Sequence, residues 1–405
     1  MGLIVFLAVL VAAGLYAQEP VAPGEAERVS ALFEVRQGER PLACAIHSLS
    51  PALTFRLIYR AGYSVTAPVE ELIEEPRTLE IVARVTPKRS GAQPVLLRDI
   101  EPLPAEAGKQ ERDASKFEAQ VTGGFYLGEG AYRLELVVAG GGLRVCRKQW
   151  DVEVKPQKGV ITALPPGGVA AASRVSLPRL ESRGGNLTIF LHASVARGNP
   201  VLLESVAAIL ERMRFHRVQV VAFSLDQRKE LLREDVAGTA DFQRLAEAVQ
   251  GYNPATVSYD VLKDPAGHRD FLWKLLAKEG LRAPPDDIVM FVGYATFDDS
   301  HVFVPPACSA GTRKPVYVYL EYALPGRARS RTPALARRRM RGVPPTGEPR
   351  QGPWADLPAV AGLQPVLPDA ISRATRACSG KVFPIYSPSD LASALEKTDE
   401  LLSRR

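Results

Sequence analysis

The feature that most constrains the fold of this 405-residue chain is a change in the spacing of its apolar residues near residue 186. Before that point, apolar and polar residues alternate with a period of two, as in strands that bury one face. After it, short runs that are apolar throughout are separated by stretches with the helical period of about 3.6 residues. The first pattern predicts an all-β region and the second an α/β region.

The all-β region extends over residues 28–154. Its alternating runs are Leu42–Ile46, Phe55–Tyr59, Leu79–Val85, Tyr132–Val138 and Trp150–Val154. Turns rich in Pro and Gly separate the runs, which predicts an antiparallel sheet with one dry face. We therefore expect a β-sandwich of the immunoglobulin-like sort. Within it, we expect the glycine-rich segment 123–130 to form a turn and the acidic run 70–75 to be a solvated surface.

The length of the chain also favours two domains, because one hydrophobic core seldom serves so many residues. Residues 155–185 are rich in Pro, Gly, Ala and Ser and show little periodicity, which is typical of a linker. The second domain is then expected over residues 186–405.

Strands and helices alternate in this second domain. Leu187–Leu191 is a short, wholly apolar run, as expected for a parallel strand buried on both faces. Asn199 and Pro200 then mark the start of a helix. Further strands are predicted at Val218–Leu225, Ile288–Val292, Pro315–Tyr322 and Lys381–Tyr386, with an antiparallel edge strand at Glu230–Arg233 and helices near 241–250, 264–280 and 388–402. The pattern predicts a doubly wound sheet.

The first residues, Met1–Ala17, have the character of a secretory signal peptide. An apolar core from Leu3 to Leu15 is followed by the small residue Ala17, after which cleavage would leave Gln18 first. The core is shorter than the roughly 20 apolar residues that a membrane span needs. A retained anchor is the alternative, because no Lys or Arg precedes the core. We expect a secreted or periplasmic protein with no membrane span after signal removal.

Export also bears on the four cysteines, because disulfides persist in oxidising compartments. Cys44 and Cys146 fall in the first domain, and Cys308 and Cys378 in the second. One bridge per domain is the simplest of the three possible pairings. Four buried free thiols are the alternative. Cys44 and Cys146 both have the parity of inward-facing residues, which favours a bridge across the first core.

Several segments of the second domain together resemble the von Willebrand factor type A domain. Arg217–Ser224 and the following Leu225–Leu232 resemble its second strand, tight turn and antiparallel edge strand. Thr256–Leu262 resembles its threonine loop and the helix after it, and Asp287–Gly293 its fourth strand. Gly380–Tyr386 with Ser389–Leu395 resembles the closing strand and helix. The two-domain layout also resembles that of uncharacterised exported proteins of acidobacterial type.

The resemblance implies a metal site that has lost its carboxylates. The family pattern Asp-x-Ser-x-Ser falls on His192–Ala196, where only Ser194 is kept, and the loop threonine falls on Thr256. The aspartate after the fourth strand falls on Tyr294, or on Gly293 if the register slips. Hard divalent cations need oxygen ligands, preferably charged ones. We therefore expect no metal and no cofactor; His192 suits softer metals, but the sequence places no second ligand beside it.

These features favour an exported, non-enzymatic interaction protein with an unidentified protein partner. The candidate binding face comprises His192, Ser194, Thr256 and Tyr294. Tyr294 either offers an amphipathic contact or fills the vacated metal cleft.

A secreted hydrolase is the alternative from another functional class. The residues available for it are His192, Ser194, Ser224, Asp226, Asp260, His268 and His301. The sequence contains no Gly-x-Ser-x-Gly elbow and no phosphate-binding loop after the first strand, so we expect no catalytic residues.

A second alternative concerns the basic segment 326–352, whose eight arginines and single acid, Glu348, roughly account for the net charge of +6. It is predicted to be a disordered insertion, and clustered arginines also suit binding to acidic polymers. Nucleic acid is not expected as a partner, because no aromatic residues are interleaved with the arginines.

Overall fold

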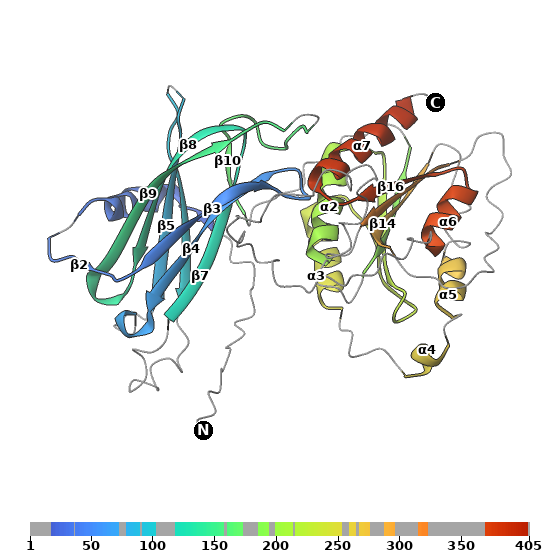
Figure 1. The fold of residues 1–405 in the computed structure, drawn as a ribbon, viewed down its shortest axis with the longest axis horizontal. Helices are drawn as coiled ribbons and strands as arrows, with labels where there is room; N and C mark the ends of the chain where they lie inside the picture. Colours follow the sequence, from blue (N-terminus) through green and yellow to red (C-terminus); the bar gives the residue numbers. More distant parts are fainter. Residues whose placement is uncertain are drawn as a thin grey trace, which may run out of the picture. The chain divides into compact units, whose positions relative to one another are not determined.

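The computed structural model describes most of the predicted elements and divides the chain into two compact units, Met1–Ser176 and Leu177–Arg405. The described residues are 18–35, 37–72, 78–89, 91–102, 118–157, 160–172, 185–193, 199–213, 215–252, 259–264, 267–275, 287–295, 315–322 and 369–403. Figure 1 shows a first unit built of strands and a second in which helices flank a sheet. Each unit is described by itself below.

Two sheets make up the first unit. The larger has the order β1 (Glu19–Pro20), β6 (Val95–Pro102), β5 (Thr78–Pro87), β8 (Gly130–Ala139), β9 (Arg144–Val154) and β2 (Arg40–Pro41). The smaller has the order β10 (Val169–Ala171), β7 (Glu118–Leu127), β4 (Tyr59–Pro68) and β3 (Ala45–Leu53). All neighbouring strands are antiparallel except the short pair β2 and β9. Short helical segments are η1 (Pro23–Glu25), α1 (Ala26–Ser30), η2 (Ala31–Phe33), η3 (Val69–Glu71) and η6 (Gly141–Leu143).

The two sheets share one hydrophobic core. Alternate residues of β4, such as Tyr63 and Val65, pack with alternate residues of β5, such as Ile81 and Val85, and all four are at most 1% exposed. This is the consequence of the period-two pattern, because successive side chains of a strand point to opposite faces. A disulfide joins Cys44 to Cys146, as the shared parity of the two cysteines predicted.

The structure corrects three details of the sequence prediction in this unit. Residues 54–58 form the turn between β3 and β4, with Leu57 at a positive φ of 60°, where a strand was predicted. Residues 123–127, predicted as a turn, belong to β7, with Phe125 buried in the core. Gly123 is required there because a Cβ atom would lie 2.2 Å from the Tyr63 hydroxyl. The predicted linker contains β10, which pairs with β7.

The second unit is built on one six-stranded sheet. Its order is β13 (Lys229–Asp235), β12 (Val218–Ser224), β11 (Leu187–His192), β14 (Ile288–Tyr294), β15 (Val316–Tyr322) and β16 (Lys381–Ile385). β13 is antiparallel to β12, as predicted, and the other neighbours are parallel. The chain order therefore reverses between β11 and β14. In doubly wound sheets, ligands bind at the carboxyl ends of the strands beside such a reversal.

Helices cover both faces of this sheet. They are α2 (Asn199–Arg212), α3 (Thr239–Gln250), α4 (Tyr259–Lys263), α5 (Gly267–Leu275), α6 (Ala370–Ala377) and α7 (Pro388–Ser403). Figure 1 shows α2, α3 and α7 on one side of the sheet and α5 and α6 on the other. The sequence reading missed α6, although Asp369 is its N-cap and accepts a hydrogen bond from the Ser372 backbone N–H. Within the described ranges, no helix has the length and apolar character needed to cross a membrane.

Candidate functional site

The two candidate residues that the structure describes lie at the carboxyl ends of the two central strands. His192 ends β11 and Tyr294 ends β14. The register of these strands places His192 beside Gly293, so Tyr294 points to the opposite face of the sheet. His192 contacts Phe223 on the face that carries α5 and α6. Tyr294 contacts Tyr322, whose hydroxyl interacts with Ser205 of α2 on the other face.

His192 is buried and electrically neutral. Its side chain is 4% exposed, and its ring stacks on that of Phe223 with 5.3 Å between the ring centroids. Burial lowers the pKa of His192 to about 4, against weak opposing effects of the Asp226 carboxylate and the Tyr294 backbone. Among the described residues, neither ring nitrogen has a hydrogen-bond partner of normal geometry. The imidazole is therefore uncharged at neutral pH and packs as an apolar ring.

Gly293 makes room for this imidazole. A Cβ atom at residue 293 would lie 2.7 Å from the Cβ of His192, which is closer than two carbon atoms pack. Gly293 and His192 are neighbours on parallel strands and face the same side of the sheet. Position 293, the alternative to Tyr294 in the sequence prediction, therefore offers no side chain at all.

Tyr294 is also buried, with 5% of its surface exposed. Its ring meets that of Tyr322 edge to face, with 6.1 Å between the centroids, a favoured aromatic geometry. Burial raises the pKa of Tyr294 to about 12, so the hydroxyl stays protonated at neutral pH. The Tyr319 hydroxyl donates to Asp369 Oδ2 at 3.0 Å and also lies 3.4 Å from the backbone carbonyl oxygen of Tyr294. The space beside β14 is thus filled by aromatic side chains.

The other two candidate residues, Ser194 and Thr256, lie outside the described residues. The structure thus brings His192 and Tyr294 to one edge of the sheet but does not join their side chains in one cluster. Within the described ranges, no three His, Cys, Asp or Glu side chains are grouped so that they could hold a metal ion. At this edge, the described strand ends offer a neutral imidazole, a neutral phenol and a glycine.

The described residues of the hydrolase alternative are held by other partners. Ser224 is fully buried, and its Oγ accepts the Gln227 backbone N–H at 3.2 Å. His268 Nδ1 lies 2.6 Å from the Leu225 carbonyl oxygen. No hydrogen bond joins Ser224 to His192 or His268 in the described part of the chain, so these residues do not form a nucleophile–base pair there. Ser194 and His301 and the side chain of Asp260 lie outside the described residues.

Two exposed tyrosines lie at the same edge and were not singled out from the sequence. Tyr386 directly follows β16 and is 47% exposed. Tyr259 begins α4 and is 70% exposed, with Lys263 Nζ 4.3 Å from its ring centroid. α4 lies at the carboxyl end of β12, because Arg228 in the turn after β12 donates to the Val261 carbonyl oxygen at 2.6 Å. The sequence signals available for them were a tyrosine at the end of a predicted strand, as at Tyr386, and one following a predicted loop, as at Tyr259.

The remaining predictions about sites concern residues beyond the described ranges. Cys378 is disulfide-bonded, but Cys308 is not among the described residues, so their pairing stays a prediction. The basic segment 326–352 and the predicted signal peptide 1–17 also lie outside the described residues.

Comparisons with known proteins add little to this geometry. No protein-family model and no curated protein matches the chain. Among solved structures, a β-glucosidase from Listeria innocua in complex with gluconolactone is similar over 29% of this chain, with 12% sequence identity and a TM-score of 0.17. The match spans 17% of the β-glucosidase chain. A similarity at this level carries no argument about fold or function.

Proposed function

We propose that this chain is an exported, non-enzymatic protein-binding protein in which a von Willebrand type A-like domain without a metal follows an immunoglobulin-like sandwich. The strand order of the second unit, with one antiparallel edge strand beside β12, supports the first part of this assignment. The two sheets on one core support the second. The Cys44–Cys146 disulfide supports an oxidising compartment.

The observation that carries the proposal is the state of His192. A residue at the end of the central strand, beside the reversal of strand order, is the natural first ligand or catalytic group of such a sheet. Here that residue is buried and neutral, and its ring stacks on Phe223. A buried uncharged ring stabilises the edge of the sheet and supplies neither a ligand charge nor a base near neutral pH.

The binding surface of this proposal includes the exposed tyrosines at the same edge. Large exposed aromatic side chains are enriched at protein interfaces, because the ring buries apolar area while the hydroxyl forms hydrogen bonds. Tyr259 and Tyr386 have this character, whereas His192 and Tyr294 lie behind the surface. In this arrangement, the buried pair holds the edge rigid and the exposed pair contacts the partner.

Affinity capture from cell-envelope fractions tests the proposal. The mature chain carries a C-terminal tag, and capture is compared in magnesium and in EDTA. We expect the same partner protein under both conditions, and we expect its recovery to fall at least tenfold for the double variant Tyr259→Ser/Tyr386→Ser. Ile161→Ser is the matched control, because Ile161 is 73% exposed in the first unit. Capture lost in EDTA, or unchanged in the double variant, would contradict the proposal.

Direct titration with Mg²⁺ and Ca²⁺ tests the metal-free part independently. We expect no saturable heat of binding, since charged oxygen ligands normally offset the cost of dehydrating these ions. Saturable binding that disappears in a Thr256→Ala variant would show that the site has kept its metal.

A further inference from the structure

Acidic side chains of strand β6 point into the interior of the first unit. Leu97, Asp99 and Glu101 alternate along the strand and therefore share its inward face. Leu97 is fully buried and Glu101 is 8% exposed. Arg98 and Ile100 point to the opposite, outer face. Two carboxyl groups thus enter the space between the sheets, where charge is costly unless it is paired.

The two carboxyl groups have unmet bonding capacity. Asp99 Oδ2 and Glu101 Oε1 are buried and have no hydrogen-bond partner among the described residues. Burial raises the pKa of both carboxyl groups; the charge of Glu19 raises that of Asp99 further, and the charge of Asp99 raises that of Glu101. Tyr63 of β4, the described titratable group that faces them, is also an acid, and Glu19 of β1, on the outer face beside Arg98, adds negative charge nearby. Among the residues that the structure describes, no basic group acts on either carboxyl group.

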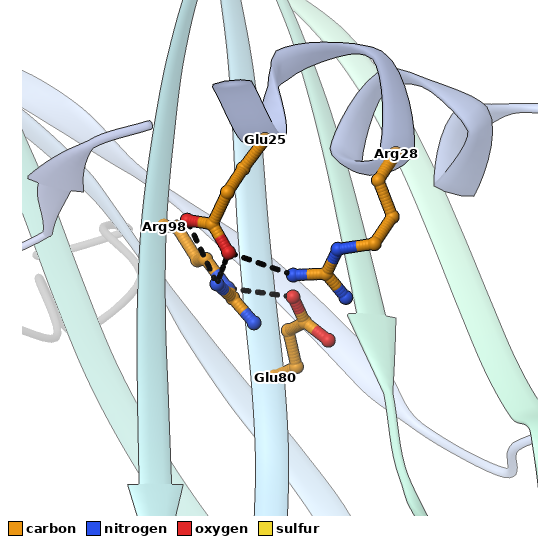
Figure 2. A network of polar contacts seen from close by, with 4 residues as sticks. All are labelled: Glu25, Arg28, Glu80 and Arg98. Carbon is orange, nitrogen blue, oxygen red and sulfur yellow. Dashed lines mark hydrogen bonds and ion pairs between the residues drawn. The ribbon is translucent and has the colours of Figure 1, made fainter. Parts of the chain in front are cut away.

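The nearest basic residue in the sequence is engaged elsewhere. Figure 2 shows Arg98 on the outer side of the sheet, together with Glu25, Glu80 and Arg28. Arg98 Nε lies 2.7 Å from Glu80 Oε1, and Arg98 Nη1 lies 3.3 Å from Glu25 Oε1. Arg28 pairs with Glu25 at 3.2 Å. These arginines neutralise outer carboxylates and cannot reach the inward pair through the sheet.

Gln18 lies beside the inward carboxyl groups. The register of β1 on β6 pairs Glu19 with Arg98 and Pro20 with Leu97, and the same register continued by one residue would set Gln18 opposite Asp99. Opposed residues of an antiparallel pair have Cα atoms about 4.5–5.5 Å apart. Gln18 is fully buried, and its Nε2 donates to the Tyr63 hydroxyl at 2.7 Å. The continued register and the burial of Gln18 therefore bring the start of this strand close to Asp99.

We propose that the α-ammonium group of Gln18, released when residues 1–17 are removed, is the counter-ion of Asp99 and Glu101. Hydrolysis of the Ala17–Gln18 bond adds one water, leaving a carboxylate on Ala17 and an amine on Gln18 that takes up a proton. The precursor has a neutral peptide nitrogen at the same position. Export processing thus supplies the missing positive charge to the sandwich and couples maturation to its stability.

The contribution of these carboxyl groups and the ammonium group to stability depends on pH in a characteristic way. In the precursor the carboxyl pKa values are raised, so their contribution to stability is present at low pH and is lost as the pH rises through the folded pKa values. In the mature chain the ammonium group lowers both carboxyl pKa values, so their contribution is lost instead as the pH falls. The carboxylates raise the α-amino pKa above about 8, and that contribution is lost as the pH rises through the raised value.

The test compares the full mature chain beginning at Gln18 with the same chain carrying Gly-Ser before Gln18. We expect the mature form to melt several degrees higher near pH 7, with the difference shrinking near pH 4 and again near pH 11. In the Asp99→Asn/Glu101→Gln background we expect the advantage to vanish. The Asp151→Asn/Glu153→Gln background is the matched control, because these carboxylates are exposed on β9, and it should keep the advantage.

Two further measurements keep the proposal open to refutation if a variant does not fold. N-terminal sequencing of the exported protein should give Gln18 as the first residue. The pH dependence of α-amine acetylation in the folded mature chain should give a pKa at least one unit above that of a free peptide amine. Equal melting temperatures of the two forms at all pH values, a normal amine pKa, or processing at another bond would each overturn the proposal.

Discussion

At the scale of single residues, the neutrality of His192 has a measurable consequence for folding. Its folded pKa of about 4 lies below the usual 6.5, so its contribution to stability is full above pH 6.5 and is lost as the pH falls toward 4. The difference corresponds to about 3 kcal/mol. We expect a His192→Phe variant, which keeps a ring but cannot take up a proton, to lose much less stability than the parent between pH 7 and pH 4.5. Urea unfolding at the two pH values measures this difference, and parallel losses would contradict the neutral assignment.

Gly293 gives a second prediction at this scale. A Gly293→Ala substitution places a Cβ atom against the His192 side chain and should lower the free energy of unfolding by about 1–3 kcal/mol, the usual cost of overpacking. Gly24→Ala is the control, because a Cβ atom there would have no neighbour within 4 Å. Chemical denaturation of both variants measures the contrast. Equal effects of the two substitutions would show that the edge of the sheet adapts to the methyl group.

At the scale of elements, a buried hydrogen bond joins Tyr319 of β15 to Asp369, the N-cap of α6, and should contribute to the free energy of unfolding. Asp369 is 2% exposed, caps α6 and accepts the Tyr319 hydroxyl. Tyr319→Phe removes that donor and leaves a buried carboxylate oxygen without it, so we expect a loss of about 1–3 kcal/mol. Tyr386→Phe removes an exposed hydroxyl and serves as the control. Thermal unfolding measures both, and a neutral Tyr319→Phe would mean that Asp369 finds another donor.

Elements whose apolar residues recur with a regular period could be predicted from the sequence. Elements that form only through contacts with distant segments could not. Leu187–Leu191, Val218–Leu225 and the antiparallel Glu230–Arg233 have counterparts in β11, β12 and β13, because their patterns reflect burial directly. β10 has only three residues and exists because β7 offers it an open edge. The candidate site shows the same limit, since the position of His192 at the strand end was predictable but its burial was not. Whether a side chain is buried depends on neighbours that are distant in sequence.

At the scale of the whole molecule, the Cys44–Cys146 bridge links residues separated by 102 positions. Closing so long a loop restricts the unfolded chain and is worth about 4–5 kcal/mol in the chain-entropy model. We therefore expect reduction with dithiothreitol, or a Cys44→Ala/Cys146→Ala double variant, to lower the unfolding free energy of the first unit by about that amount. Guanidinium unfolding followed by tryptophan fluorescence in a Trp273→Phe/Trp354→Phe background reports on this unit, because only Trp150 then remains and it packs on the first core. No change on reduction would contradict the prediction.

The outermost strands of the larger sheet in the first unit offer little backbone for pairing with another copy of the chain. These strands, β1 and β2, are each two residues long, and each ends in a proline. A proline has no N–H group to donate. A strand of two residues therefore offers few backbone hydrogen-bonding groups to the backbone of another chain. At high local concentration, the folded sheet should therefore resist growing sideways into fibrils.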